Sequence, residues 1–337
     1  MSIQYNNYSS LTDYLDRNAV YASNQSFYTN KLTLIRGAVI VGLAPKAHLS
    51  LSKELLEWKI YTMFSFIDTN SFFTIKNASD LEMSEKVTVA YFIGMVFAQI
   101  HMQKMYNVRH LEHLKNPGII PTSLPGDLKN PDLWGLNHRT GQSYLVEAKG
   151  STALSNYFIN KHVRKADSQL RAITQIDYTV SGVISTFNQA STNLEKLIIA
   201  THPNLNGEMM QHIIDPIEEE DKVVKVSGDE MVYKHYSHLV NFLSVQQSKI
   251  KELHQLSKVK FRIIDFDAFN CSIGLLEEIY QILNPLVAKE NLVQENLTNI
   301  NKELNLVLDR FEKVSNHDLE NEKFSIGIDG VIVLEKS

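Results

Sequence analysis

The chain contains very little cysteine and no long apolar segment. Cys271 is the only cysteine among the 337 residues, which excludes an intramolecular disulfide and a cysteine-rich zinc site and fits a reducing cytoplasm. The most apolar early segment, residues 33–45, contains Arg36 and is too short to span a bilayer, so we expect a core strand or short helix there. Residues 1–24 lack the basic and apolar regions of a signal peptide. These absences predict a cytoplasmic protein with no membrane partner.

The sequence also lacks an excess of positive charge. The net charge is −5 and the sequence pI is about 6.2, so no overall positive field favours nucleic acid, although a local basic patch can be sufficient for binding. Hydrophobic residues make up 44% of the chain and charged residues 21%, as in ordinary globular proteins. At this length the chain can form two modest domains, or one domain with appendages.

Several common catalytic motifs are absent. The chain contains no G-x-x-x-x-G-K-[ST] phosphate loop, no G-x-G-x-x-G, no G-x-S-x-G and no H-E-x-x-H. The sequence therefore gives no support to a P-loop nucleotidase, a dinucleotide-binding enzyme, an α/β-hydrolase or a zinc metalloprotease.

The most informative segment is residues 130–150, N-P-D-L-W-G-L-N-H-R-T-G-Q-S-Y-L-V-E-A-K-G. Its polar, glycine-containing centre, residues 137–141, is typical of a turn between two strands. Side chains alternate along a strand, so Glu147 and Lys149 share a face with Leu145 in an otherwise apolar strand. Charges are rarely placed on a buried strand unless they pair, bind metal or take part in chemistry. Together with Asp132 from the preceding strand, they form our candidate active site.

Helices and strands alternate around this hairpin. The hydrophobic pattern predicts helices over residues 50–66, 84–106 and 161–176, and strands over residues 107–114, 178–187 and 196–201. Ser50 or Ser52 can cap the first helix, and Glu85 can either cap the second electrostatically or reach the active site. Gly94, on the second helix, permits close contact with a neighbouring element. This order predicts an α/β core in which helices flank a mixed central sheet.

The remaining sequence predicts helical additions at both ends of this core. We expect an N-terminal accessory region over residues 1–78, the core over residues 79–205, and a mainly helical C-terminal region over residues 206–337. In the last region we predict helical segments over residues 233–256, a strand over residues 259–266 and a hairpin over residues 324–334. Its final helix has a heptad-like seam: Val293, Leu297, Ile300, Leu304, Val307, Phe311 and Val314. This seam can pack on the same chain or form the interface of a homodimer or with a partner protein.

Two other acidic groups are weaker candidates for metal binding. Asp265 and Asp267 share one face at the end of a predicted strand, where a turn or helix cap is the alternative. The stretch D-P-I-E-E-E-D, residues 215–221, is expected to be an exposed loop. We therefore keep the hairpin as the primary site.

The hairpin pattern resembles the PD-(D/E)xK nuclease superfamily, which has the restriction-endonuclease-like fold. The resemblance rests on Pro131 before Asp132, on Glu147-Ala148-Lys149 after the hairpin, and on the helices before and after it. It covers residues 80–205. The alternative is a surface hairpin in which Lys149 pairs with a neighbouring carboxylate.

The resemblance implies metal-dependent hydrolysis of a phosphodiester. Asp132 and Glu147 offer hard oxygen ligands suited to Mg²⁺, for which Mn²⁺ can substitute, and the main-chain carbonyl of Ala148 completes the set as the resemblance implies. The metal lowers the pKa of bound water and screens the phosphate. Lys149 would orient or deprotonate the attacking water and stabilise developing negative charge.

The helix that follows the hairpin is locally basic. Four cations can contact backbone phosphates: Lys161, Arg164, Lys165 and Arg171. Gln169 corresponds to a glutamine that often faces the site in related nucleases, whereas Ile173 stands where some families have a tyrosine. A solvated helix glutamine is the alternative for Gln169. His138 and Arg139 in the turn can touch DNA, or be solvated turn residues.

These features predict a metal-dependent nuclease that acts on DNA, with a role in restriction, anti-phage defence or repair. One alternative is a catalytically inactive protein of the same fold that binds nucleic acid or a protein partner. Another is an oligomeric interaction protein without catalysis, which would bind no divalent metal and tolerate Glu147→Ala.

Overall fold

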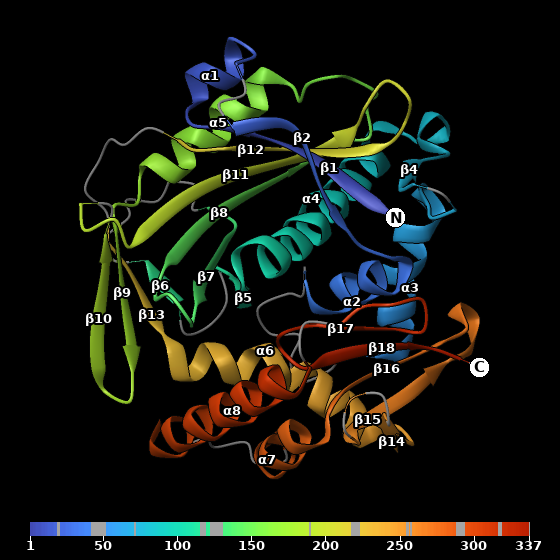
Figure 1. The fold of residues 1–337 in the computed structure, drawn as a ribbon, viewed down its shortest axis with the longest axis vertical. Helices are drawn as coiled ribbons and strands as arrows, with labels where there is room; N and C mark the ends of the chain where they lie inside the picture. The colour runs from blue at the N-terminus through green and yellow to red at the C-terminus, as the bar shows by residue number, and fades with distance from the viewer. Residues whose placement is uncertain are drawn as a thin grey trace.

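A computed structural model describes residues 1–18, 21–41, 52–70, 72–114, 119–121, 131–188, 190–216, 223–253, 256, 258–287, 294–315 and 319–336. Three larger sheets organise these residues, with helices packed between and around them (Figure 1). None of the helices in this part of the chain is long and apolar enough to cross a membrane.

A seven-stranded sheet forms the centre. Its order is β2 (Tyr21–Tyr28), β1 (Ser2–Tyr8), β12 (Met209–Ile214), β11 (Leu194–Pro203), β8 (Ser143–Gly150), β7 (Leu133–Asn137) and β5 (Val108–His113). β1 runs parallel to β12 and β11 parallel to β8, whereas the other neighbours are antiparallel. The predicted α/β architecture with a mixed sheet flanked by helices is therefore confirmed, as are the predicted hairpin and the strands near residues 107–114 and 196–201.

Two helices cover the middle of this sheet. α4 (Met83–Tyr106) and α5 (Asn160–Arg171) each pack on both β8 and β11. Tyr106 of α4 contacts Tyr144 with ring centroids 5.0 Å apart, whereas the charge of Lys149, which alternates to the opposite face of β8, acts on His162 of α5. The two helices therefore lie on opposite faces. The side chain of Glu85 accepts a 2.9 Å hydrogen bond from the Glu82 N–H, so Glu85 caps α4.

A glycine pair brings α4 against β8 at the end of the strand. A side chain on Gly150 would overlap the carbonyl oxygen of Ala90 and the amide of Gly94, and one on Gly94 would lie 2.8 Å from the Gly150 nitrogen. Neither position can hold a larger residue without moving the helix from the strand. The close contact predicted at Gly94 is thus made with the strand that carries Glu147 and Lys149.

The N-terminal residues do not form a separate accessory layer. β1 and β2 enter the central sheet, followed by α1 (Leu11–Leu15), α2 (Lys31–Ile40) and α3 (Lys53–Phe66) and by the short elements β3 (Ile67–Asp68), β4 (Thr74–Ile75) and η2 (Ala78–Asp80). Ser52 caps α3 by accepting from the Leu55 N–H at 3.2 Å, as predicted. α2 accounts for the apolar segment after residue 33, and residues 42–51, including Ser50, lie outside the described ranges.

Residues 175–188 belong to a second sheet and differ from the predicted helix end and single strand. Its order is β10 (Val183–Asn188), β9 (Gln175–Val180), β13 (Val223–Ser227) and β6 (Ile119–Pro121). The predicted strand over residues 178–187 is in fact a hairpin, because Ser181 and Gly182 adopt positive φ values of 55° and 75°. The predicted helix ends at Arg171, five residues early, because Gln175 and Ile176 pair with Asn188 and Phe187. Cross-strand pairing outweighs helical periodicity here.

The C-terminal region contains a third sheet beside its helices, which the expectation of a mainly helical region did not include. The five strands have the order β14 (Lys249–Leu253), β15 (Val259–Phe266), β16 (Cys271–Leu276), β18 (Val331–Glu335) and β17 (Phe324–Ile326). α6 (Gly228–Val245), α7 (Glu277–Val287) and η4 (Asp267–Phe269) complete this region together with α8 (Gln294–Ser315). The helix predicted over residues 233–256 ends at Val245, and β14 follows. The predicted strand and final hairpin are confirmed.

The seam of α8 packs on the same chain. Its buried residues include Leu297, Leu304, Val307 and Phe311, and the helix contacts α6 and α7 (Figure 1). Val314 is 42% exposed, and Val293 lies outside the described residues. Intrachain packing therefore accounts for the heptad-like pattern.

A buried polar network joins the third sheet to the central one. His235 on α6 lies 2.5 Å from Glu112 of β5 and 3.3 Å from Asp329, in the β17–β18 turn. Asp329 also accepts from Gln103 of α4 at 2.9 Å, and Gln103 accepts from Arg36 of α2 at 2.5 Å. Burial lowers the pKa of His235, but hydrogen bonds to Asp329 and Glu112 and their charges outweigh this effect and raise it to about 9. These contacts make the charged histidine a cross-link between the two sheets.

We predict that Gly150→Ala destabilises the protein by about 1–3 kcal/mol or more, because the added methyl group must push α4 from β8. Chemical unfolding of both proteins measures this difference. Gly141→Ala is the comparison, since no atom lies within 4 Å of a Cβ at Gly141 and only its positive φ of 74° opposes alanine there, so this variant should lose less stability than Gly150→Ala. A Gly150→Ala variant as stable as the wild type would contradict the close approach.

We also predict a pH-dependent role for His235. Because its folded pKa lies above its ordinary value of 6.5, the stability it contributes is fully present below pH 6.5 and is lost as the pH rises through about 9. The difference in unfolding free energy between wild type and His235→Gln should shrink by about 3 kcal/mol over this range. Burial lowers the pKa values of Lys59 and Lys104 to about 7. Both proteins contain these lysines, so their contribution to the pH dependence of stability cancels in the difference. If the unfolding free energies of wild type and His235→Gln differ by the same amount at every pH, the proposed role of His235 is wrong.

Candidate active site

Asp132, Glu147 and Lys149 meet at the end of the β7–β8 hairpin. Register pairs Leu133 with Val146, so Asp132, immediately before β7, lies opposite Glu147. The Asp132 N–H donates to Glu147 Oε2 at 2.9 Å, and the Ala148 N–H donates to Asp132 Oδ2 at 3.2 Å. Lys149 donates to Glu147 Oε1. The three residues predicted from the sequence are therefore in direct contact.

Glu147 is the buried member of this group. Its exposed fraction is 0%, whereas the Lys149 side chain is 20% exposed. Burial, and after it the charge of Asp132, raise the pKa of Glu147, whereas Lys149 and the hydrogen bond from the Asp132 N–H lower it; the net pKa is about 7. A buried carboxylate next to a second carboxylate is stabilised by a cation. In this structure Lys149 supplies that cation.

The same group offers oxygen atoms of the kind that Mg²⁺ takes as ligands. Mg²⁺ usually takes one or two protein carboxylates and keeps several waters, and Asp132 and Glu147 provide two. The N–H and C=O of one strand residue point to the same edge, so the Ala148 carbonyl faces the side on which its N–H bonds Asp132. Within the described ranges, no cluster of three or more His, Cys, Asp or Glu side chains is arranged to hold a metal. The donors that fit are thus two carboxylates, the carbonyl and water.

Two further residues, Tyr91 and His162, lie beside the site and were not predicted from the sequence. Tyr91 of α4 is 44% exposed, and its pKa is raised by burial and by the charge of Asp132. His162, in the first turn of α5, is exposed, and its pKa is lowered by burial and by Lys149, Lys165 and Lys161 in that order. The sequence could have indicated Tyr91, because it lies four residues after Val87 on the same face of an otherwise apolar helix.

The cations of α5 divide into two groups. Lys161, Arg164 and Lys165 are exposed, whereas Arg171 forms an ion pair with Asp167 at 2.7 Å. Gln169 is half-buried on the same helix, beside the buried Ala166 and Leu170. The first three cations thus lie at the surface, in the part of α5 that contains His162, on which the charge of Lys149 acts.

The turn of the hairpin contacts α8. Arg139 donates to Glu312, and burial followed by the charge of Arg109 lowers the pKa of His138 to about 4. Arg109 itself pairs with Glu312 at 2.9 Å and with Asp309 at 2.6 Å. These contacts hold the turn against the C-terminal helix and give Arg139 a protein partner.

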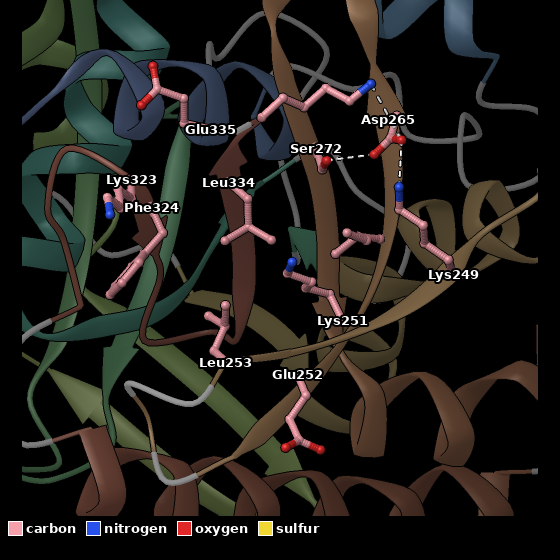
Figure 2. Close-up of a pocket in the computed structure, with 12 residues that line it drawn as sticks. Lys249, Lys251, Glu252, Leu253, Asp265, Ser272, Lys323, Phe324, Leu334 and Glu335 are labelled. Carbon is pink, nitrogen blue, oxygen red and sulfur yellow. Dashed lines mark hydrogen bonds and ion pairs between the residues drawn. The ribbon is translucent and has the colours of Figure 1, made fainter.

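The acidic pair Asp265 and Asp267 is neutralised by lysines. Figure 2 shows Asp265 between Lys249 and Ser272 in a cavity of about 440 Å³ on the third sheet, and these contacts measure 2.6 and 2.7 Å. Hydrogen bonds from Lys249 and Ser272 lower the pKa of Asp265 to about 2. Lys336 bonds Asp267 and lies 3.5 Å from Asp265. Lysine ammonium groups therefore neutralise both aspartates. Most of the acidic stretch 215–221 lies outside the described residues.

Comparison of the chain with family models, curated proteins and solved structures found no match in any of the three.

We predict that Lys149→Ala raises the pKa of Glu147 further, because the variant removes the cation that opposes burial and the charge of Asp132. Carbon NMR of labelled glutamate side chains in metal-free protein measures this change. Lys161→Ala, at an exposed position on α5, is the matched control and should leave the titration unchanged. An unaltered Glu147 titration in Lys149→Ala would show that the ion pair has no electrostatic effect.

Proposed function

We propose that the protein is a Mg²⁺-dependent nuclease that hydrolyses phosphodiester bonds of DNA. The observation that carries this proposal is the direct contact of Asp132, Glu147 and Lys149 at one end of a buried strand. Two carboxylates and a lysine in this relation match the requirements of phosphodiester hydrolysis, in which an anionic substrate needs positive charge and an activated water.

The order of elements supports the resemblance to PD-(D/E)xK nucleases. Helix α4, strand β5, the β7–β8 hairpin, helix α5 and strand β11 occur in this order within residues 83–203, with β6 and the β9–β10 hairpin of the second sheet inserted between them. The carboxylates come from the hairpin, and α4 and α5 pack on opposite faces of β8. We infer a restriction-endonuclease-like core from this order, to which β1, β2 and β12 add strands at one side.

The donor set indicates where the metal would bind. Asp132, Glu147 and the Ala148 carbonyl would hold it, and the bound ion would lower the pKa of a water and screen the scissile phosphate. Glu147 then has a cationic partner besides Lys149. The backbone N–H groups of Asp132 and Ala148 keep both carboxylates oriented, because each donates to one of them.

The protein's own side chains have distinct tasks in this proposal. Lys149 donates hydrogen bonds to the attacking water or to a phosphate oxygen, and so stabilises negative charge as it develops. Lys161 and Arg164 contact backbone phosphates on the α5 side. Gln169 lies on the same helix, and we include it among the catalytic residues on the resemblance alone. Because phosphate contacts are electrostatic, binding should weaken as salt concentration rises.

We predict metal-dependent cleavage that requires Asp132 and Lys149. Wild-type protein should cut plasmid or linear DNA with Mg²⁺ or Mn²⁺ and not with chelator. Asp132→Ala and Lys149→Ala should each reduce the rate by about 100-fold or more, since each removes a group that acts on the reacting water or phosphate. Gel assays at several time points provide the rates.

The control is Asp265→Ala, which removes a carboxylate from the third sheet and should leave cleavage unchanged. Circular dichroism of every variant checks that folding is preserved. Equal cleavage by wild type and Asp132→Ala, or cleavage that persists in chelator, would contradict the proposed active site. An absence of cutting combined with an absence of metal binding would favour the non-catalytic interaction protein.

A further inference from the structure

An apolar surface is exposed next to the candidate active site. On the first turns of α4, Met83, Val87 and Tyr91 are 74%, 64% and 44% exposed, and the spacing of four residues aligns them on one face. On α3, Leu55 and Trp58 are 39% and 50% exposed. Exposed apolar patches of this kind mark binding surfaces in soluble proteins.

Three aromatic rings connect the two helices within this surface. Phe92 is 5% exposed and lies between two half-exposed rings. Its ring centroid is 5.4 Å from that of Trp58 and 5.9 Å from that of Tyr91, with interplanar angles of 72° and 68°. These edge-to-face contacts fix both outer rings at modest entropic cost. Of the two tryptophans, Trp134 is fully buried and Trp58 alone presents its ring at the surface.

This aromatic surface continues into the candidate active site. Tyr91 is one residue from Ala90, whose carbonyl contacts the backbone at Gly150, directly after Lys149. The charge of Asp132 acts on the Tyr91 phenol. On the opposite face of the sheet, α5 presents the exposed Lys161 and Arg164 near the same strand end. A chain crossing the end of β8 would thus meet aromatic rings on one side and cations on the other.

The charges around the rings favour one orientation of such a chain. Glu54 on α3 and Glu82 and Glu85 at the start of α4 are exposed acids, whereas the lysines on the same turns, Lys53 and Lys86, are only partly exposed. Lys53 also pairs with Glu57 at 3.9 Å, so the exposed charge here is mainly negative and repels phosphate groups. Phosphates therefore face α5 and bases face α3 and α4. Aromatic rings stack on unpaired bases of any sequence, whereas bases in a duplex have their faces already covered by neighbouring pairs.

We propose that Trp58 and Tyr91 form a stacking platform for unpaired bases, so that the nucleic acid is single-stranded where it crosses the active site. The proposal rests on the nuclease function and adds its substrate class. It predicts that single strands, or single-stranded regions of a duplex, bind and react in preference to fully paired DNA. A protein partner on the same surface is the competing occupant.

The test is the binding of fluorescently labelled DNA to the full chain in chelator, which prevents cutting. A single-stranded oligonucleotide should bind at least 10-fold more tightly than the blunt duplex of the same sequence. Tyr91→Ala and Trp58→Ala should each weaken single-strand binding by about 5-fold to 100-fold, the range for losing one stacked base. Tyr91→Phe keeps the ring and should retain the affinity.

Matched controls separate stacking from general effects. Tyr28 is 53% exposed, and Lys104, near the far end of α4, donates to its carbonyl; Tyr28→Ala should bind like the wild type. Trp58 is the exposed one of two tryptophans, so single-stranded DNA should quench the protein's fluorescence, and Trp58→Phe should lose the quenching while keeping the affinity. Thermal melting of each variant shows whether the fold is retained.

The outcomes distinguish this inference from the proposed function. Equal binding of single and double strands, or unchanged binding by Tyr91→Ala and Trp58→Ala, overturns the stacking platform even if the protein cleaves DNA. A single-strand preference that depends on both rings supports the platform even if the protein cleaves no DNA. In that case the nuclease function is rejected and the binding surface is retained. Capture of a protein that competes for Trp58, without DNA binding, also overturns the inference.

Discussion

Burial of the Glu147 carboxylate is the constraint on which the site depends. A carboxylate removed from water is costly unless other groups supply hydrogen bonds and opposite charge. Glu147 receives one hydrogen bond from the Asp132 backbone and one from the Lys149 ammonium. These partners come from the start of β7 and from two residues further along β8, so the pairing of the hairpin and the solvation of Glu147 depend on each other.

The rest of the fold holds that strand in place. β8 lies between β11 and β7, and α4 and α5 close its two faces. The glycine contact at Gly150 brings α4 close to the strand end, which also brings Tyr91 beside Asp132. The His235 network joins the third sheet to the edge strand β5, where Glu112 pairs with Trp134 of β7, and α8 contacts the turn of the hairpin. The C-terminal region thus supports the site through contacts with β5 and the turn.

The sequence was most informative where interactions are local. The hairpin, α4 with its Glu85 cap, α3 with its Ser52 cap and strand β15 all follow from periodicity, turn residues and capping residues within one segment. The adjacency of Asp132, Glu147 and Lys149 also follows, because a tight hairpin fixes which residues face each other.

Features that depend on distant segments were not predictable in this way. β1 pairs with β12, about two hundred residues later, and His235 meets Glu112 and Asp329 from different sheets. The hairpin of β9 and β10 was mistaken for one strand because its turn, at Ser181 and Gly182, interrupts the apolar pattern by only two residues. Tyr91 was not singled out because its position beside Asp132 comes from the packing of α4 on the strand end.

The most direct test of the central claim is a calorimetric titration of metal-free protein with Mn²⁺, a stand-in for Mg²⁺. If Asp132 and Glu147 hold a divalent cation, the wild type should show saturable binding that Asp132→Asn and Glu147→Gln each weaken by at least about 10-fold. Asp265→Asn, which alters the lysine-neutralised acid of the third sheet, should bind like the wild type. Saturable binding that is unchanged in Asp132→Asn, or no saturable binding in the wild type, would contradict the account.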